Sequence, residues 1–188
     1  MRVSKAQQAK NRERVVAAAA RLLRERGIEG IGVDALAEAA GLTHGAVYSH
    51  FDSKGDLAAA AVARALAETS AQWKAAGAGD AAGAFNQLVR HYVSRSHRDD
   101  PGHGCAVAAM GPDAMRHPRQ VRRAFSDGIT AMIETVAGAC EGATEEARRD
   151  EAIAAISAMV GAIVLARALE DRTLSDRVLL TVRRKLMT

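Results

Sequence analysis

The sequence has few residues that interrupt a helix or shape a fold rigidly. Only 3% of its 188 residues are aromatic, and its three prolines all lie between positions 101 and 118. In contrast, 42 residues are alanine, the best helix former. Because 48% of the residues are apolar and 26% are charged, the composition is that of a folded globular protein and excludes a disordered chain. We therefore predict an all-α fold.

Cysteines and long apolar runs are also scarce. Two cysteines, Cys105 and Cys140, are too few for a disulfide framework. The N-terminus lacks the apolar segment of a secretory signal. The longest uncharged apolar run, Ala152–Ala166, would span about 22 Å as a helix, less than the roughly 30 Å core of a bilayer. These absences predict a soluble, cytoplasmic protein without a membrane partner.

The net charge is small but unevenly distributed. The chain has 26 lysines and arginines against 22 acidic residues, which gives a formal charge of +4. Residues 1–14 contain five cations and one glutamate, so their net charge equals that of the whole chain. A basic segment supplies non-specific attraction to nucleic-acid phosphates. We therefore expect this N-terminal arm to favour DNA.

Apolar periodicity and helix-end signals divide the chain into a small N-terminal unit, residues 1–55, and a larger helical body, residues 56–188. Gly27 should end the first helix, and Ser53 should cap a long helix that follows the unit. A loop is expected at 98–104. The predicted helices, about nine in all, cover residues 6–26, 33–40, 44–50, 54–76, 81–97, 105–110, 118–139, 145–169 and 175–187.

The segment from Gly41 to Lys54 reads GLTHGAVYSHFDSK. It forms part of two short predicted helices joined by a turn, an arrangement typical of a helix-turn-helix. Leu36, Ala37 and Val47 should pack between these helices, and Thr43 should cap the second one. The spacing alone equally fits two ordinary short helices with solvated polar faces.

The chemistry of the second short helix suits a DNA groove. Gly45 and Ala46 are small enough for the helix to approach base edges closely, and together with His44 they are expected to face the bases. Contacts to phosphate oxygens fix position rather than sequence. The predicted phosphate contacts are Thr43, Tyr48, Ser49, His50 and Lys54. Tyr48 should place its ring in the core and its hydroxyl outward.

Residues 9–60 resemble the DNA-binding domain of the TetR/AcrR family of bacterial transcriptional repressors. The matching segments are Gly27–Gly30, Val33–Leu42, Thr43–Phe51 and Ser53–Leu57. The resemblance implies a homodimer, a pseudo-palindromic double-stranded DNA operator and a small-molecule inducer. This interpretation requires no enzymatic activity, and we predict no cofactor. The resemblance also implies that Tyr48, His50 and Lys54 contact the phosphate backbone. One position departs from the family pattern, because Gly32 stands where Ser or Thr is usual.

The last two predicted helices have features of a dimer interface. Small residues recur at intervals of three and four within the first of them: Ala154, Ser157, Ala158, Gly161, Ala162 and Leu165. The final helix carries Val178, Leu179, Val182 and Leu186, with Arg183, Arg184 and Lys185 facing water. The resemblance implies that these two helices form a four-helix interface between subunits. A plain core role is the alternative.

The resemblance also implies an inducer pocket, which we expect among the middle helices at residues 64–140. The candidate lining residues, each of which could instead belong to the core, are Trp73, Phe85, Tyr92, His97, Cys105, Met110, Met115 and Phe125. The histidines and the cysteine of this stretch lack metal-ligand spacing, so we predict no metal site.

Cys105 supports a more specific hypothesis. It follows residues 101–104 at the predicted start of a helix, where the helix N-terminus and a protonated neighbour, His103, would make a thiol reactive. The Gly-Cys arrangement also resembles a subgroup of the family in which a cysteine senses electrophiles. The alternative is a buried structural cysteine. Two rival functions remain, a thiol enzyme using His103 and Cys105 and a helical ligand-binding protein that does not bind DNA.

Overall fold

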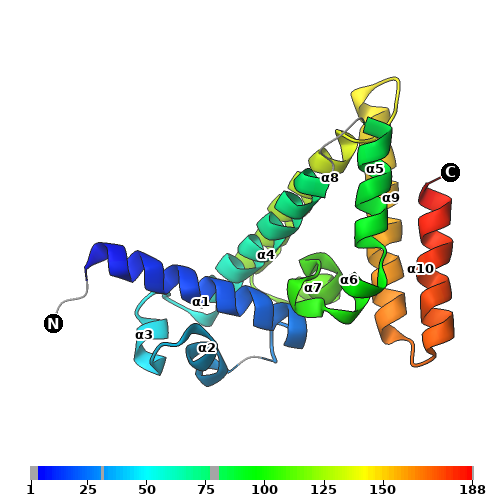
Figure 1. The fold of residues 1–188 in the computed structure, drawn as a ribbon. Coiled ribbons are helices and arrows are strands. Elements are labelled where there is room, and N and C mark those ends of the chain that lie inside the picture. The colour runs from blue at the N-terminus through cyan, green and yellow to red at the C-terminus, as the bar shows by residue number, and fades with distance from the viewer. Residues whose placement is uncertain (1–3, 31, 77–80, 188) are drawn as a thin grey trace.

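The computed structural model describes residues 4–30, 32–76 and 81–187. The regular structure of this part of the chain is entirely helical, with ten α-helices, two short 3-10 helices and no strand (Figure 1). The helices are α1 (Lys5–Arg26), α2 (Val33–Ala40), α3 (His44–Tyr48), α4 (Lys54–Ala76), α5 (Ala81–Tyr92), α6 (Arg95–Asp99), η1 (Pro101–His103), α7 (Ala106–Met110), η2 (Gly111–Arg116), α8 (Arg119–Ala137), α9 (Glu145–Ala168) and α10 (Arg172–Leu186). The all-α prediction, with three helices in the N-terminal unit, is confirmed.

Two glycines end the first two helices in conformations that favour glycine. Gly27, with φ 76°, donates its N–H to the carbonyl of Leu23, as expected for a helix end. Gly41 ends α2 with φ 61°. A Cβ atom at Gly41 would lie 2.6 Å from Nη2 of Arg14, which donates a 3.4 Å hydrogen bond to the Gly41 carbonyl. The α2–α3 turn is thus fixed against α1.

The core of the N-terminal unit holds the helix-turn-helix together. Leu36, Ala37 and Val47 are buried, as predicted. Phe51 packs half-buried against this core, and the guanidinium of Arg12 lies over its ring, 5.1 Å from the centroid. Because α3 has only five residues, its position depends on this packing rather than on its own helix propensity.

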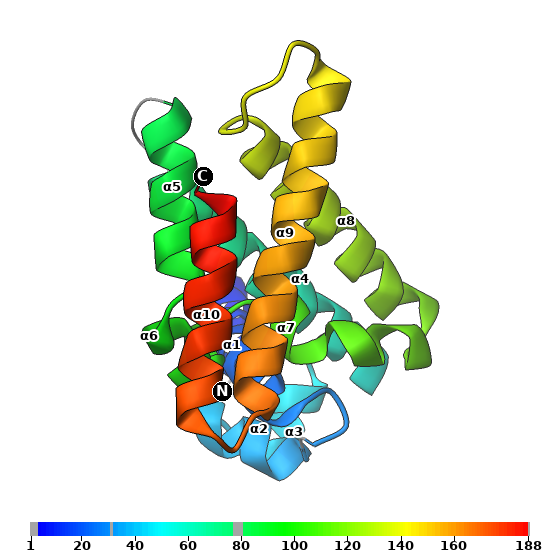
Figure 2. The ribbon, with the colours of Figure 1, turned by 90° about the vertical axis from the view of Figure 1, so that its right-hand side faces the viewer.

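The body consists of long helices packed side by side. Helices α4 and α8 form one slanted pair, and α5, α9 and α10 form a second group, with α6 and α7 between them at the base (Figure 1). Helices α9 and α10 lie next to each other on one side of the molecule (Figure 2). Among the described helices, α9 has the length and hydropathy of a possible membrane span. In this structure its Ile156, Met159 and Ile163 are buried in the body.

The region after α5 differs from the prediction. The expected helix over 81–97 ends at Tyr92, and α6 begins after Ser94, whose hydroxyl accepts a 3.2 Å hydrogen bond from the His97 N–H. The expected loop at 98–104 contains the end of α6 and η1. The predicted helix over 175–187 begins earlier, at Arg172, because the carboxylate of Asp171 caps it. Side chains with capping ability decide both boundaries.

Candidate DNA-binding surface and ligand pocket

Helix α3 presents its smallest residue to solvent. Gly45 is exposed, and nothing lies within 4 Å of the position that a Cβ atom would take. Ala46 is half-buried, and Val47 anchors the inner side of the helix in the core. Thr43 occupies the N-cap position, but contrary to our expectation its side chain makes no capping hydrogen bond. The hydroxyl of this exposed threonine is therefore not committed to the helix.

Several polar side chains around α3 have local or solvent-exposed partners within the protein. Ser49 donates its hydroxyl to a carbonyl of its own helix at 2.8 Å. Nζ of Lys54 lies 3.3 Å from a carboxylate oxygen of Glu29, and Nε2 of His44 lies 3.7 Å from one of Asp34. Both contacts are exposed, and exposed pairs of this kind contribute little to stability. A phosphate group could therefore replace the carboxylate of Glu29 beside Lys54.

The side chain of Tyr48 is outside the described residues, so the prediction for its ring and hydroxyl concerns a part that the structure does not describe. His50 follows α3 and is half-buried. It lies beside the exposed Ser49, at the end of the helix that carries Gly45.

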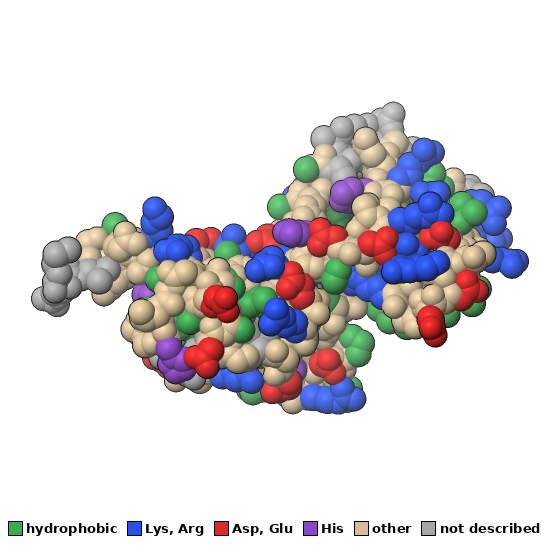
Figure 3. All heavy atoms as spheres, turned by 60° about the horizontal axis from the view of Figure 1, so that its bottom comes forward, with side chains coloured by type: hydrophobic (Ala, Val, Ile, Leu, Met, Phe, Trp, Pro, Cys, Tyr) green, Lys and Arg blue, Asp and Glu red, His purple; other side chains and the backbone are tan. Residues whose placement is uncertain are grey.

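The basic arm is only partly free. Arg2 lies outside the described residues, whereas Lys5 and Lys10 are exposed on α1. Arg12 and Arg14 are engaged with Phe51 and with the carbonyl of residue 41. From below, basic and acidic side chains alternate with uncharged ones over the N-terminal unit, without a continuous basic patch (Figure 3).

Helix α4 connects this surface to a cavity in the body. Near its start, Leu57 and Ala58 are buried in the core shared with the helix-turn-helix. Near its end, Thr69 and Trp73 line the cavity. At 1.5 Å per residue, the distance along α4 from Lys54 to Trp73 is about 28 Å.

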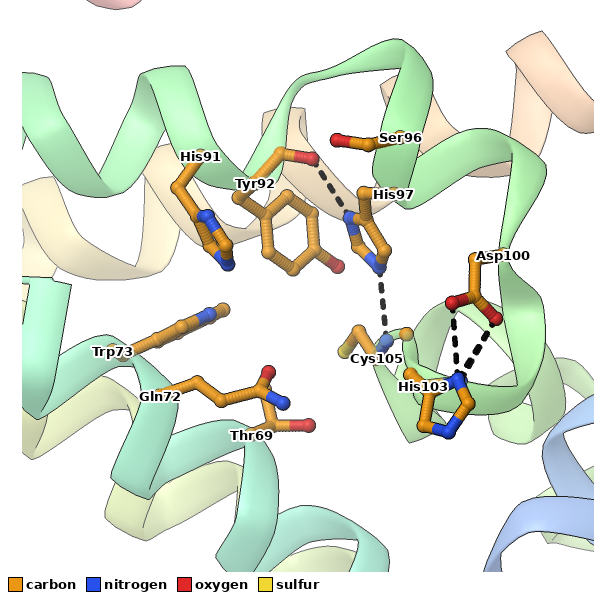
Figure 4. A pocket seen from close by; sticks show the side chains of 11 residues that line it. Thr69, Gln72, Trp73, His91, Tyr92, Ser96, His97, Asp100, His103 and Cys105 are labelled. Carbon is orange, nitrogen blue, oxygen red and sulfur yellow. Dashed lines mark hydrogen bonds and ion pairs between the residues drawn. The ribbon is translucent and has the colours of Figure 1, made fainter.

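The cavity has a volume of about 220 Å³ and lies between α4, α5, α6 and the segment before α7 (Figure 4). It is lined by Thr69, Gln72, Trp73, His91, Tyr92, Ser96, His97, Asp100, His103, Gly104 and Cys105. Four of these were predicted from the sequence as lining residues, namely Trp73, Tyr92, His97 and Cys105, and His103 was named there only as a neighbour of Cys105. The other lining residues, most of them polar, were missed, because no local pattern shows that α4 faces the loop after α6.

The remaining candidates do not line this cavity. Met110 and Phe125 are buried in the core, which is the alternative role that the sequence left open for each. Phe85 is half-buried beside Cys140 at a separate surface hollow. Met115 is 78% exposed on η2.

His97 joins two segments of the cavity wall. Its Nδ1 donates to the carbonyl of Tyr92 at 2.7 Å, and its Nε2 accepts the N–H of Cys105 at 2.9 Å. Burial lowers the pKa of His97 to about 4, with the nearby Arg167 charge acting in the same direction against the Tyr92 hydrogen bond. The imidazole is therefore neutral near pH 7 and holds the loop by hydrogen bonds alone.

The surroundings of Cys105 differ from those expected. Cys105 is the N-cap residue of α7 rather than a residue of its first turn, and it is only 2% exposed. His103 is exposed and directed to a carboxylate oxygen of Asp100 at 3.0 Å. The imidazole that contacts Cys105 is the neutral ring of His97. His97, which accepts the backbone N–H of Cys105, therefore does not supply the protonated neighbour that we expected for the thiol.

Tyr92 places a buried hydroxyl in the cavity wall. The residue is 2% exposed, and its hydroxyl has no geometrically formed hydrogen bond among the described residues, where its polar neighbour is the weakly hydrogen-bonding thiol of Cys105. Burial raises the pKa of Tyr92 well above its ordinary value, and the nearby Cys105 acts in the same direction. The ring meets Trp73 edge to face, with centroids 5.4 Å apart. Behind Gly104, Arg167 donates to the carbonyls of residues 97 and 98.

A buried arginine links the cavity loop to the N-terminal unit. Arg24 on α1 is 7% exposed, and its Nε donates to the carbonyl of Gly102 at 2.6 Å. Its Nη1 and Nη2 both donate to Glu68 on α4 at 3.0 Å. Glu68 also accepts a hydrogen bond from Arg64 at 2.7 Å. The Arg24 side chain therefore joins α1, α4 and η1. From the sequence alone, an arginine on an amphipathic helix would be expected to face water.

The comparisons with known proteins agree with this architecture. Residues 15–61 match the family model described as bacterial regulatory proteins, tetR family. The fold is similar to that of E. coli NemR in its reduced form, with a TM-score of 0.73 and 19% identity over 93% of this chain and 96% of that one. A TetR-family transcriptional regulator from Cytophaga hutchinsonii matches with a TM-score of 0.76 and 20% identity over 100% of this chain and 96% of that one. A TetR transcriptional regulator from Chloroflexus aurantiacus J-10-FL matches with a TM-score of 0.74 and 25% identity over 97% of each chain. A search among curated proteins finds no significant match.

Residues 15–61, which contain α2, α3 and parts of α1 and α4, therefore match the tetR family of bacterial regulatory proteins, and the whole chain has the fold of TetR-family transcriptional regulators. The helix-turn-helix is the DNA-binding element of this class of protein.

Proposed function

We propose that the protein is a cytoplasmic transcriptional repressor that binds a palindromic operator as a homodimer and is released by a small-molecule inducer. In this proposal residues 1–55 bind DNA, and residues 56–188 bind the inducer and dimerise. The observation that carries the proposal is the continuity of α4, which begins beside the solvent-open α3 and ends in the wall of the cavity.

The α3 helices of two subunits would enter successive major grooves, which are roughly 34 Å apart on one side of the duplex. The absence of a side chain at Gly45 would allow close approach to base edges. The polar side chains at the ends of the helix would hold phosphates on either side. These contacts, at Thr43, Tyr48, Ser49, His50 and Lys54, set the register of α3 in the groove.

An exposed face of α9 and α10 supports dimerisation. Ala154, Ser157 and Leu165 are exposed on α9, with Leu165 at 58%, and Leu174 and Leu180 on α10 are each 44% exposed. The two helices lie side by side, so these residues are available to a second copy (Figure 2). Of the apolar residues of α10 that the sequence suggested for this role, Leu179 is buried within the subunit, whereas three are only partly buried against its core and keep some exposed surface: Val178, Val182 and Leu186. Ala162 is also buried within the subunit.

Induction would act through the two connections between the cavity and the N-terminal unit. A ligand that displaces Trp73 or the loop near Gly102 would move the end of α4 or the contact with Arg24. Either displacement changes the placement of α3 relative to the body. Such a ligand shifts the equilibrium only by the difference between its affinities for the two states.

DNA binding can be tested with a matched pair of variants of α4. Duplexes selected from a random library by the wild-type protein are titrated by fluorescence anisotropy at several salt concentrations. Lys54→Gln should weaken binding and reduce the salt slope by about one for each phosphate that is no longer neutralised. Lys74→Gln changes an exposed lysine at the far end of the same helix and should have no effect.

If the wild-type protein selects no duplex even at low salt, the proposed function is wrong. If Lys54→Gln and Lys74→Gln behave alike, the assigned phosphate contact is wrong and DNA binding stands.

A second candidate function, sensing through a cysteine, is favoured by the presence of Cys105 in the cavity lining. Its 2% exposure requires the cavity to open before a reagent can reach the sulfur. The test is alkylation of a Cys140→Ser variant, in which Cys105 is the remaining thiol. Loss of operator affinity after full modification supports sensing, and unchanged affinity excludes it.

A further inference from the structure

The cavity beside Tyr92 is small. Its volume of about 220 Å³ lies below the roughly 300–1,000 Å³ typical of sites for drug-sized ligands. Space of this size admits a compound with one ring and short substituents.

The walls of the cavity favour a flat ligand. The rings of Trp73 and Tyr92 meet at 76°, and the rings of Tyr92 and His97 meet at 72° with centroids 4.4 Å apart (Figure 4). Aromatic side chains set at steep angles to one another provide edges and faces for a further ring. An aromatic ligand would therefore extend an existing cluster.

The charges of the lining disfavour an anion. Among the described residues, no lysine or arginine lines the cavity, and the one carboxylate, that of Asp100, faces His103 at the exposed rim. His97 is neutral near pH 7, and both of its ring nitrogens already have backbone partners. Arg167 lies behind Gly104 and donates to the backbone carbonyls of residues 97 and 98, so an anion would leave water without gaining a direct cationic partner.

The Tyr92 hydroxyl supplies the specific polar contact. Most buried hydroxyls in folded proteins have a hydrogen-bond partner, and a buried hydroxyl without one is unfavourable. The positive charge of Arg167, behind Gly104, lies near Tyr92 and favours an electronegative atom at this end of the cavity. A carbonyl or hydroxyl oxygen of a ligand would meet both conditions.

We propose that this cavity binds a small, uncharged aromatic compound that carries one hydrogen-bonding oxygen, and that this oxygen accepts the hydrogen bond of the Tyr92 hydroxyl. The assignment rests on the proposed function, because it names the class of inducer for the cavity from which α4 leads to the DNA-binding surface.

The chain contains its own probe for this ligand. Trp73 is the only tryptophan, it is 2% exposed, and it lines the cavity, so its fluorescence reports occupancy. Four compounds of similar size are titrated against the full-length protein: acetophenone, ethylbenzene, benzoate and benzylammonium. Acetophenone should bind at least tenfold more tightly than each of the other three, which lack either neutrality or the acceptor oxygen.

Two variants separate the hydrogen bond from general effects. Tyr92→Phe removes the unpartnered hydroxyl and should weaken acetophenone binding about fivefold, with no change for ethylbenzene. Ser70→Ala removes the other buried hydroxyl without a partner among the described residues, which is on α4 but outside the lining, and should change neither affinity. Thermal unfolding of both variants verifies that they fold.

Equal binding of acetophenone and benzoate, or an unchanged acetophenone affinity in Tyr92→Phe, would overturn the assignment. DNA binding by the same preparations is measured separately by anisotropy. Failure to bind acetophenone with intact DNA binding refutes this inference alone. Acetophenone binding without DNA binding refutes the proposed function alone.

Discussion

Gly45 is a position at which a larger side chain should weaken DNA binding without destabilising the fold. Its backbone is helical, and a side chain at this position would meet no protein atom within 4 Å of its Cβ. Replacing glycine in a helix by leucine is favourable by up to about 1 kcal/mol. We therefore expect the Gly45→Leu variant to unfold at the same temperature as the wild-type protein or at a slightly higher one.

The expected effect of Gly45→Leu on DNA binding has the opposite sign. If α3 lies in a major groove with Gly45 toward the bases, the new side chain occupies the space of the base contacts. Contacts to one base pair contribute about 1–3 kcal/mol, and a dimer forfeits them in both half-sites. The affinity for the selected duplex should fall at least about 30-fold, the equivalent of ~2 kcal/mol.

The measurement is anisotropy with the duplex selected by the wild-type protein, together with thermal unfolding. Gly138→Leu is the control, because Gly138 is exposed at the end of α8, has helical dihedral angles and has no neighbour closer than 3.5 Å to its would-be Cβ. Wild-type affinity in Gly45→Leu would refute close docking of α3. Equal decreases in the two variants would show that the effect is not local.

Two further predictions concern stability. Arg24→Met removes the three hydrogen bonds that a 7% exposed guanidinium donates to Gly102 and Glu68. The free energy of unfolding, measured by urea titration, should therefore fall by about 2 kcal/mol. Arg21→Met is the control, because it removes only an exposed ion pair and should cost less than about 1 kcal/mol. The second prediction concerns pH. The folded protein keeps His97 neutral down to about pH 4, whereas in the unfolded chain its pKa is about 6.5. The unfolded state binds more protons between these values, so the free energy of unfolding should decrease as the pH falls from 6.5 to 4, by an amount on the order of 2 kcal/mol. Above pH 7 this group should contribute no pH dependence, and a His97→Gln variant that retains the full decrease would contradict the assignment.

The sequence predicts those elements whose ends are set by local chemistry. The predicted bounds of α2 agree with the observed ones because Gly32 and Gly41 flank this helix. Ser53 caps α4 as expected, with its hydroxyl accepting the N–H of Asp56 at 3.1 Å. The break at Ser94 was missed because the apolar periodicity continues across it, and a serine that caps a helix looks like any other serine within one.

The cavity could be predicted only in part, for a related reason. Aromatic residues on predicted helices are good candidates for a pocket, and Trp73 and Tyr92 do line it. The same criterion selected Phe125, which is buried in the core. Periodicity identifies the buried side of a helix, but whether that side meets another helix or a cavity depends on contacts between distant segments.

Because α4 is long, a small tilt of the helix about one end displaces its other end by a large distance. A tilt of about 5° about its far end would displace the beginning of a rod about 28 Å long by about 2.4 Å. In a symmetric pair of subunits the two displacements add to about 5 Å, which exceeds the roughly 3.4 Å rise of one base pair. A small movement at the Trp73 end of α4 would thus be enough to place the two α3 helices out of register with the major grooves of the double helix.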